Sequence, residues 1–177
     1  MTVVVCSLGA NLGDRLARLR DAVDGLRAHR VSGVYETPPW GDLDQPRYLN
    51  AVAVGHHPSR TPRDWLALAQ SIETRAGRIR DPARRYGPRP LDIDLIAMWT
   101  ESGDPVLSDD PELTLPHPLA WRRAFVLVPW LELDPDAILP GHGRVADLVA
   151  GPEVNADTPG VHRRCDLVLR PVADCTR

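Results

Sequence analysis

The sequence predicts an α+β domain in which helices pack on an antiparallel sheet. Short apolar runs and period-two alternation mark four strands, and apolar residues recur at helical spacing in two stretches between them. The predicted strands cover Thr2–Leu8, Val31–Glu36, Tyr48–His56 and Pro90–Met98, and the helices follow Asp14 and Thr61. This β-α-β-β-α-β order predicts a ferredoxin-like core, with extra elements C-terminal to it.

The composition indicates one globular domain. With 177 residues, 43% apolar and 25% charged, the chain can bury a core that needs no disulfide or metal. The net charge of −3 argues against a general nucleic-acid binder, so clustered arginines are expected to act locally. The chain contains no lysine, which excludes a Walker A loop and Schiff-base chemistry.

The cysteines and the N-terminus indicate the compartment. Cys6, Cys165 and Cys175 are odd in number and lack metal-like spacing, so buried free thiols in a reducing compartment are expected. The N-terminal apolar run is short and follows no basic segment, which favours a buried strand over a signal peptide. We therefore expect a cytoplasmic protein without membrane or nucleic-acid partners, and a monomer.

The first strand leads directly into the first helix. Glycines follow the strand, and Asp14 is placed to cap the helix. Leu16, Leu19, Val23 and Leu26 then recur at helical spacing and give an apolar stripe that can pack on the sheet.

The second strand runs into the stiff segment Thr37-Pro38-Pro39-Trp40-Gly41, whose prolines cannot continue a central strand. It is either a surface turn or a rigid wall that offers backbone groups to a flat ligand.

In the third strand, alternation places Tyr48 and Asn50 side by side. A carboxamide can read the edge of a heterocycle while a phenol ring stacks on its face, although a buried pair without a ligand is the commoner arrangement. The alternation puts Tyr48, Asn50, Val52 and Val54 on one face, and Leu49, Ala51 and Ala53 on the other.

The second helix begins at Thr61-Pro62-Arg63-Asp64, a capping pattern, and Gly77 is placed to end it. Between Arg75 and Arg89 there are six arginines interrupted by glycines and prolines, a composition typical of a loop. We expect residues 77–88 to be mobile and to close over bound phosphates as a lid.

Asp92 and Asp94 follow this basic loop. In a strand they point to the same face, because side chains alternate with period two. Such a pair is often only a turn cap or a solvated edge, and in isolation that is the commoner explanation. Beside arginines, however, two carboxylates suit magnesium and phosphate chemistry.

The C-terminal part is less regular. Residues 99–111 form an acidic, turn-rich excursion, and His117 is held between two prolines. An apolar run from Phe125 to Leu133 follows. Gly151–Pro159 is interpreted as a linker, and Cys165–Arg170 as one more strand. The expected division is a domain of residues 1–151 and a tail of residues 152–177.

These segments resemble the 6-hydroxymethyl-7,8-dihydropterin pyrophosphokinase family of folate biosynthesis, from Val3 to Val149. The resemblance rests on five motifs in order: Leu8–Gly13, Tyr35–Pro39 with Gly41, Asp44–Asn50, Gly87–Arg89 leading to Leu91–Asp94, and Leu115–Pro118. It implies a ferredoxin-like α+β fold and an enzyme that transfers the β,γ-pyrophosphoryl group of ATP to the pterin hydroxymethyl group, with two magnesium ions.

The resemblance also implies residue roles. The pterin would lie between the rings of Tyr48 and Phe125, and Asp92 and Asp94 would bind the metals. The implied catalytic residues are Arg80, Arg85, Asp92 and Asp94. The implied ATP contacts are Gln70, Glu73, Arg78, Arg80, Arg85, Arg89, Leu95, Thr114, His117 and Arg123. The implied pterin contacts are Thr37, Pro38, Trp40, Tyr48, Asn50, Tyr86, Asp92 and Phe125. The choice between Arg84 and Arg85 as a phosphate contact stays open, as does the role of Glu112.

Two other functions compete with this one. A ferredoxin-like module could grip RNA or a protein with its arginine loop, but it would carry several aromatics among the basic residues, and only Tyr86 lies there. A two-metal phosphoesterase would recruit more acidic or histidine ligands than one aspartate pair.

Overall fold

The computed structural model describes residues 2–79 and 87–170. Within these ranges a six-stranded antiparallel sheet has the order β10-β3-β4-β1-β5, and β2 also pairs with β4. Its strands are β1 (Thr2–Ala10), β2 (Arg30–Val31), β3 (Tyr35–Thr37), β4 (Tyr48–His57), β5 (Asp92–Trp99) and β10 (His162–Arg163). The order of β3, β4, β1 and β5 is that of a ferredoxin-like core, which confirms the predicted fold class.

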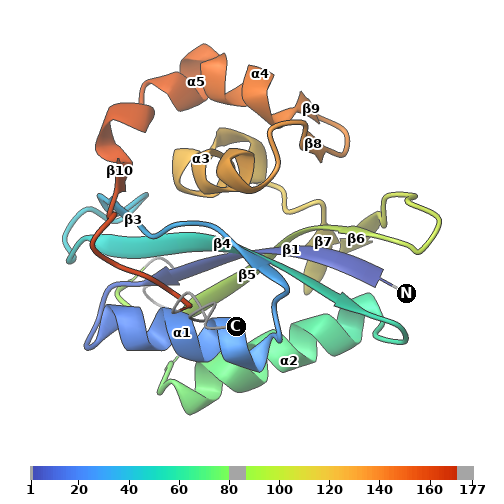
Figure 1. The fold of residues 1–177 in the computed structure, drawn as a ribbon, viewed down its shortest axis with the longest axis horizontal. Helices are drawn as coiled ribbons and strands as arrows, with labels where there is room; N and C mark the ends of the chain where they lie inside the picture. Colours follow the sequence, from blue (N-terminus) through green and yellow to red (C-terminus); the bar gives the residue numbers. More distant parts are fainter. Residues whose placement is uncertain (1, 80–86, 171–177) are drawn as a thin grey trace, which may run out of the picture.

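The sheet lies between two layers (Figure 1). Helices α1 (Arg15–Gly25) and α2 (Pro62–Arg75) cover one face, and α3 (Ala124–Leu133) covers the other, with α4 (Val145–Ala150) and α5 (Pro152–Asn155) outside it. The smaller elements are the hairpins β6 (Ser108–Asp110) with β7 (Leu113–Leu115) and β8 (Ile138–Leu139) with β9 (Gly143–Arg144), and the 3₁₀ turns η1 (Ala120–Arg122) and η2 (Thr158–Gly160).

Local sequence signals account for the main elements. The Asp14 carboxylate accepts a hydrogen bond from the Ala17 N–H at 3.0 Å and caps α1. Thr61 and Asp64 form a reciprocal capping box at the start of α2, and Gly77, at a φ of 86°, follows its end.

The predicted alternation of β4 is also confirmed. Leu49, Ala51 and Ala53 pack in the core beneath α1 and α2, whereas Val52 and Val54 pack in the core beneath α3.

Five predictions need correction. The strand expected at Val31–Glu36 is split into β2 and β3, because the Ser32 hydroxyl accepts the Val52 N–H at 2.9 Å and interrupts the ladder. The excursion at residues 99–111 contains β6. The expected linker Gly151–Pro159 contains α5 and the buried Val154, which packs in the core beneath α3.

No strand forms at Cys165–Arg170; the C-terminal strand is instead β10, and the Val168 carbonyl accepts from Arg20 of α1. Cys6 is a buried free thiol, but Cys165 is exposed, so burial was wrongly expected for it. Burial raises the pKa of Cys6 to about 12, which keeps it protonated. Cys175 lies outside the described residues.

Candidate active site

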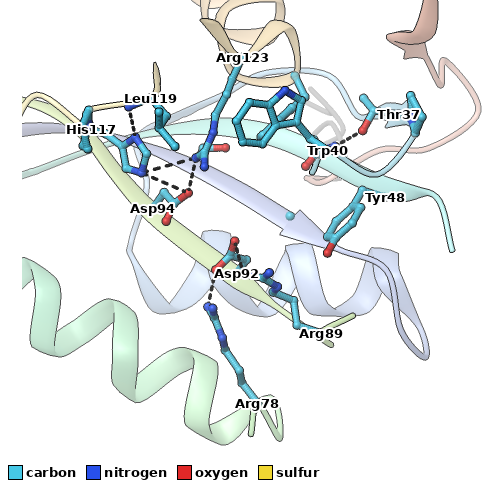
Figure 2. Close-up of a pocket in the computed structure, with 16 residues that line it drawn as sticks. Thr37, Trp40, Tyr48, Arg78, Arg89, Asp92, Asp94, His117, Leu119 and Arg123 are labelled. Atoms are coloured by element: carbon cyan, nitrogen blue, oxygen red, sulfur yellow. Dashed lines mark hydrogen bonds and ion pairs between the residues drawn. The ribbon is translucent and has the colours of Figure 1, made fainter. Parts of the chain in front are cut away.

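An open cavity of about 240 Å³ lies on the α3 side of the sheet. Its floor consists of β1, β4 and β5, and its walls are the segment after β3, the start of α3 and residues 117–119 (Figure 2). The lining residues are Ser7, Gly9, Thr37, Pro38, Trp40, Tyr48, Asn50, Arg78, Arg89, Asp92, Asp94, His117, Pro118, Leu119, Arg123 and Phe125.

The two aspartates of β5 both point into this cavity, as the alternation predicted. Ile93 and Leu95, which flank Asp94, are buried on the opposite face among residues of the α1 and α2 core. Antiparallel pairing places Asp92 beside Gly9 and Asp94 beside Ser7 of β1. Because both β1 neighbours are small, the carboxylates stay accessible from the cavity.

Asp92 is held by two arginines. Arg89 donates to one carboxylate oxygen at 3.1 Å, and Arg78 contacts the other oxygen together with the carboxylate of Glu73. The Arg89 backbone is fixed by Asn11, whose side-chain oxygen accepts the Arg89 N–H at 2.8 Å. Burial disfavours the charge of Arg89, but Asp92 and Tyr48 outweigh it and raise the Arg89 pKa.

Asp94 has a different pair of partners. Arg123 donates to it at 3.0 Å, and His117 Nε2 lies 3.8 Å from the same oxygen. His117 Nδ1 accepts the Leu119 N–H at 3.1 Å, and Arg123 Nη1 lies 3.4 Å from His117 Nε2. Burial, followed by repulsion from Asp92, raises the pKa of Asp94 to about 6 despite Arg123.

Arg123 is itself buried and stacked between aromatic rings. Its guanidinium carbon lies 5.1 Å from the ring centre of Trp40 and 5.6 Å from that of Phe125. Its Nε has no hydrogen-bond partner within the described part of the chain. Arg123 therefore joins the carboxylate part of the cavity to its aromatic part.

The opposite wall is a hydrogen-bonded polar group beside an aromatic ring. The Asn50 amide donates to the Thr37 hydroxyl at 2.7 Å, and both residues are buried. Tyr48 donates to Gln45 at 3.0 Å, and burial is the main cause that raises the Tyr48 pKa. This wall offers amide and hydroxyl groups next to a ring face, which suits a flat heterocycle.

Some residues that the resemblance assigned to ATP lie elsewhere. Gln70 is exposed on α2, Leu95 is buried in the opposite core, and Thr114 donates to the Asp110 carbonyl at 3.1 Å. Glu73 is buried, and it accepts the Ile93 N–H at 2.8 Å. None of these four side chains lines the cavity.

Other predicted site residues, namely Arg80, Arg85 and Tyr86, lie outside the described residues. So do Arg84, the alternative to Arg85 as a phosphate contact, and most of the expected lid. Glu112 is exposed and pairs with Arg63 at 3.2 Å.

The structure adds lining residues that sequence reasoning did not name as site residues: Ser7, Gly9, Pro118 and Leu119. One of them had a readable signal. A glycine inside a strand often marks a close approach of another group. A Cβ on Gly9 would lie 2.9 Å from the Asn50 side-chain oxygen, so the glycine makes room for this wall.

A ferredoxin-like sheet with two neighbouring carboxylates and buried guanidinium groups in one cavity has the features that enzymes of phosphoryl or pyrophosphoryl transfer need. A family model described as 7,8-dihydro-6-hydroxymethylpterin-pyrophosphokinase (HPPK) matches residues 5–135. The chain belongs to this family, which confirms the resemblance seen in its motifs.

Named relatives agree. A Mycobacterium tuberculosis protein named 2-amino-4-hydroxy-6-hydroxymethyldihydropteridine pyrophosphokinase is 51% identical over 145 residues, covering 78% of this chain and 76% of the relative. A Mycobacterium leprae protein of the same name is 50% identical over 151 residues, covering 81% and 78%. A Pseudomonas aeruginosa protein of that name is 37% identical over 153 residues, covering 83% and 90%.

Solved structures share the fold. Plasmodium falciparum HPPK-DHPS with pterin and p-hydroxybenzoate matches with a TM-score of 0.64 at 14% identity, over 92% of this chain and 46% of that chain. The present chain thus spans less than half of that protein, and the likeness concerns the fold alone. No helix within residues 2–79 and 87–170 is long and apolar enough to cross a membrane.

Proposed function

We propose that the cavity transfers the β,γ-pyrophosphoryl group of ATP to the hydroxymethyl oxygen of 6-hydroxymethyl-7,8-dihydropterin, giving AMP and the pterin pyrophosphate for folate biosynthesis. The observation that carries this proposal is the position of Asp92 and Asp94. They lie between a group of arginines and a wall suited to a heterocycle, within one cavity. A phosphate chain and a pterin can therefore meet at the same carboxylates.

The nucleotide phosphates bind on the arginine side. Arg78, Arg89 and Arg123 now pair with carboxylates, and all three guanidinium groups are largely buried. Phosphate oxygens are strong acceptors for such groups, and pyrophosphoryl transfer needs positioning and charge neutralisation more than covalent help. His117 and the proposed catalytic residues Arg80 and Arg85 belong to this part of the proposal.

Glu73 acts through its neighbours. Its carboxylate receives the Ile93 N–H and pairs with Arg78, and its side chain is 4% exposed. A carboxylate so enclosed has little surface for a nucleotide, so Glu73 orients Arg78 and fixes the start of β5. It is a positioning residue in this proposal, whereas direct ATP contact by Gln70, Leu95 and Thr114 stays a prediction.

The donor set fits magnesium. Mg²⁺ is usually held by one or two carboxylates together with substrate phosphates and water. Asp92 and Asp94 supply two carboxylates on one strand face. In the described part of the chain there is no group of three or more acidic, histidine or cysteine ligands, the kind of set that a phosphoesterase recruits. Bound magnesium would neutralise and orient the phosphate oxygens, while Asp92 also orients the attacking hydroxyl.

The pterin binds on the other side. Tyr48 offers a ring face, and Asn50 is held in one orientation by Thr37, so its side-chain oxygen is aimed before a ligand arrives. Preorganised polar groups of this kind discriminate between heterocycles, because a mismatched partner would leave them unpaired. Phe125, Pro38 and Trp40 complete the wall.

The experiment is a product analysis with defined substrates. The chain is incubated with ATP, magnesium and the hydroxymethyldihydropterin, and AMP and pterin pyrophosphate are expected in equal amounts. ATP without the pterin should give no AMP. Release of inorganic phosphate instead of AMP would favour a phosphoesterase. Tight binding of RNA without any turnover of ATP would favour the RNA-binding module.

We also propose that two magnesium ions bind, that the protein is a cytoplasmic monomer, and that the chain divides at residue 151 into a domain and a tail. Analytical ultracentrifugation tests the monomer, and magnesium titration at fixed ATP tests the number of ions.

A further inference from the structure

Residues 158–164, here called the C-terminal brace, lie beyond the residues that match the family model. The brace comprises η2, β10 and the residues that join and follow them. In Figure 1 it descends from α5 along the outer edge of β3. It therefore borders the strand that leads into the proposed pterin wall.

The brace extends the sheet beside that strand. His162 pairs with Glu36 and Arg163 with Tyr35, and the Arg164 N–H donates to the Val34 carbonyl at 2.8 Å. β3 is only three residues long, and its other edge pairs with β4. Without β10, this short strand would be an open edge held on one side only.

The brace also contacts the cavity wall directly. A Cβ on Gly160 would lie 3.2 Å from both Cγ and Cδ of Pro38, so any side chain at position 160 would press against Pro38. Pro38 lines the cavity. The Gly160 carbonyl in turn accepts from Arg47, the residue before Tyr48, at 3.4 Å. Gly160 thus lies beside both Pro38 and Arg47, the two ends of the loop that connects β3 to β4.

Ion pairs hold the brace in place on both faces of the sheet. Glu36 lies 3.6 Å from Arg164 and 3.1 Å from Arg15. Arg163 donates at 3.0 Å to Glu132 of α3, which also accepts the Tyr35 hydroxyl at 2.7 Å. The position of the brace is therefore fixed by α1, β3 and α3 together.

We propose that the C-terminal brace positions the pterin wall, with Gly160 and Arg163 as positioning residues for the pterin half of the site. This inference rests on the proposed function. Pro38 and the end of β3 are pressed between brace and cavity, so a displaced brace moves the groups that contact the pterin. The arginines of the nucleotide half make none of these contacts, so a displaced brace should affect pterin binding more than ATP binding.

The test compares substitutions in the full chain. Gly160→Val adds atoms against Pro38, and Arg163→Ala removes the ion pair with Glu132 of α3. Gly151→Val is the control for the first, because its Cβ would meet the Leu148 carbonyl oxygen at the same 3.2 Å but away from the cavity. Arg144→Ala is the control for the second, because Arg144 pairs with Asp136 at 2.9 Å on the surface.

The readouts are the KM for pterin, the KM for ATP, kcat and the melting temperature. Gly160→Val should raise the pterin KM about tenfold, because small displacements of positioning groups have effects of this order. Arg163→Ala should raise it severalfold, and the ATP KM should stay within about twofold in both. Both controls should leave the pterin KM unchanged.

Equal losses for both substrates, or an unchanged pterin KM in Gly160→Val, would overturn the proposal. If Gly160→Val does not fold, Arg163→Ala decides by the same criteria. Failure of the wild-type chain to bind pterin would instead refute the proposed function, so the two failures are distinguishable.

Discussion

Gly9→Ala is expected to damage the pterin site selectively. The added methyl group would lie 2.9 Å from the side-chain oxygen of Asn50, closer than a carbon and an oxygen normally approach. Asn50 cannot easily retreat, since it is buried and bonded to Thr37 at 2.7 Å. To relieve the close contact between the methyl group and Asn50, this hydrogen bond must lengthen or β1 and β4 must move apart.

The size of the effect follows from that geometry. Overpacking by one methyl group in a rigid site typically costs about 1–3 kcal/mol. If about 2 kcal/mol of this falls on the orientation of Asn50, the affinity for pterin drops by roughly 30-fold. The affinity for ATP should change by less than about twofold, because the added methyl group would meet Asn50 and Tyr48 and none of the arginines.

Gly55→Ala is a matched control in the same sheet. Its Cβ would lie 2.9 Å from the Trp65 ring, which is fully buried on the opposite face of β4. The same overpacking there should lower the melting temperature by about 5 °C, at roughly 2–4 °C per kcal/mol. Its affinity for pterin should match that of the wild type.

Calorimetric titration with pterin and with a non-hydrolysable ATP analogue measures both affinities, and a melting curve measures stability. Wild-type affinity for pterin in Gly9→Ala would contradict a steric effect on Asn50. So would a loss of pterin affinity in Gly55→Ala that equals the loss in Gly9→Ala.

Three further outcomes are expected. Asp94→Asn should lower kcat about a thousandfold with an unchanged circular dichroism spectrum, since one charge pair near the phosphates is worth roughly 4 kcal/mol; near-normal turnover would contradict the metal assignment. Tyr48→Ala should weaken pterin binding by ~1–3 kcal/mol in calorimetry and leave ATP binding unchanged; equal losses would place Tyr48 elsewhere. Burial raises the Glu132 pKa, but hydrogen bonds from Tyr35, Arg163 and Gly33 outweigh it and hold the pKa below 4.5. The stability that Glu132 contributes is thus fully present above pH 4.5, and it is lost as the pH falls through the lower pKa that Glu132 has in the folded protein. Denaturant melts of Glu132→Gln should show a smaller loss on acidification, and identical pH profiles would argue against this role.

The sequence by itself determined the local features of the site. Period-two alternation was enough to predict that Asp92 and Asp94 share a face of their strand, and that Tyr48 and Asn50 share a face of theirs. Capping residues located both main helices. These predictions succeeded because they depend on neighbours within a few residues, where backbone geometry alone sets the direction of each side chain. The order of five motifs then identified the family.

Only the tertiary structure decided which distant residues meet. Pairing of β1 with β5 put Ser7 and Gly9 beside the aspartates, a register that no local pattern contains. Glu73 is buried and accepts the Ile93 N–H, which supports its proposed positioning role, although a carboxylate near a basic loop could equally have faced the ligand. The segment interpreted as a linker and tail supplies Val154 to the core and β10 to the sheet. Its polar, turn-rich composition gave little local signal, because its position depends on packing against α3 and β3, far away in the chain.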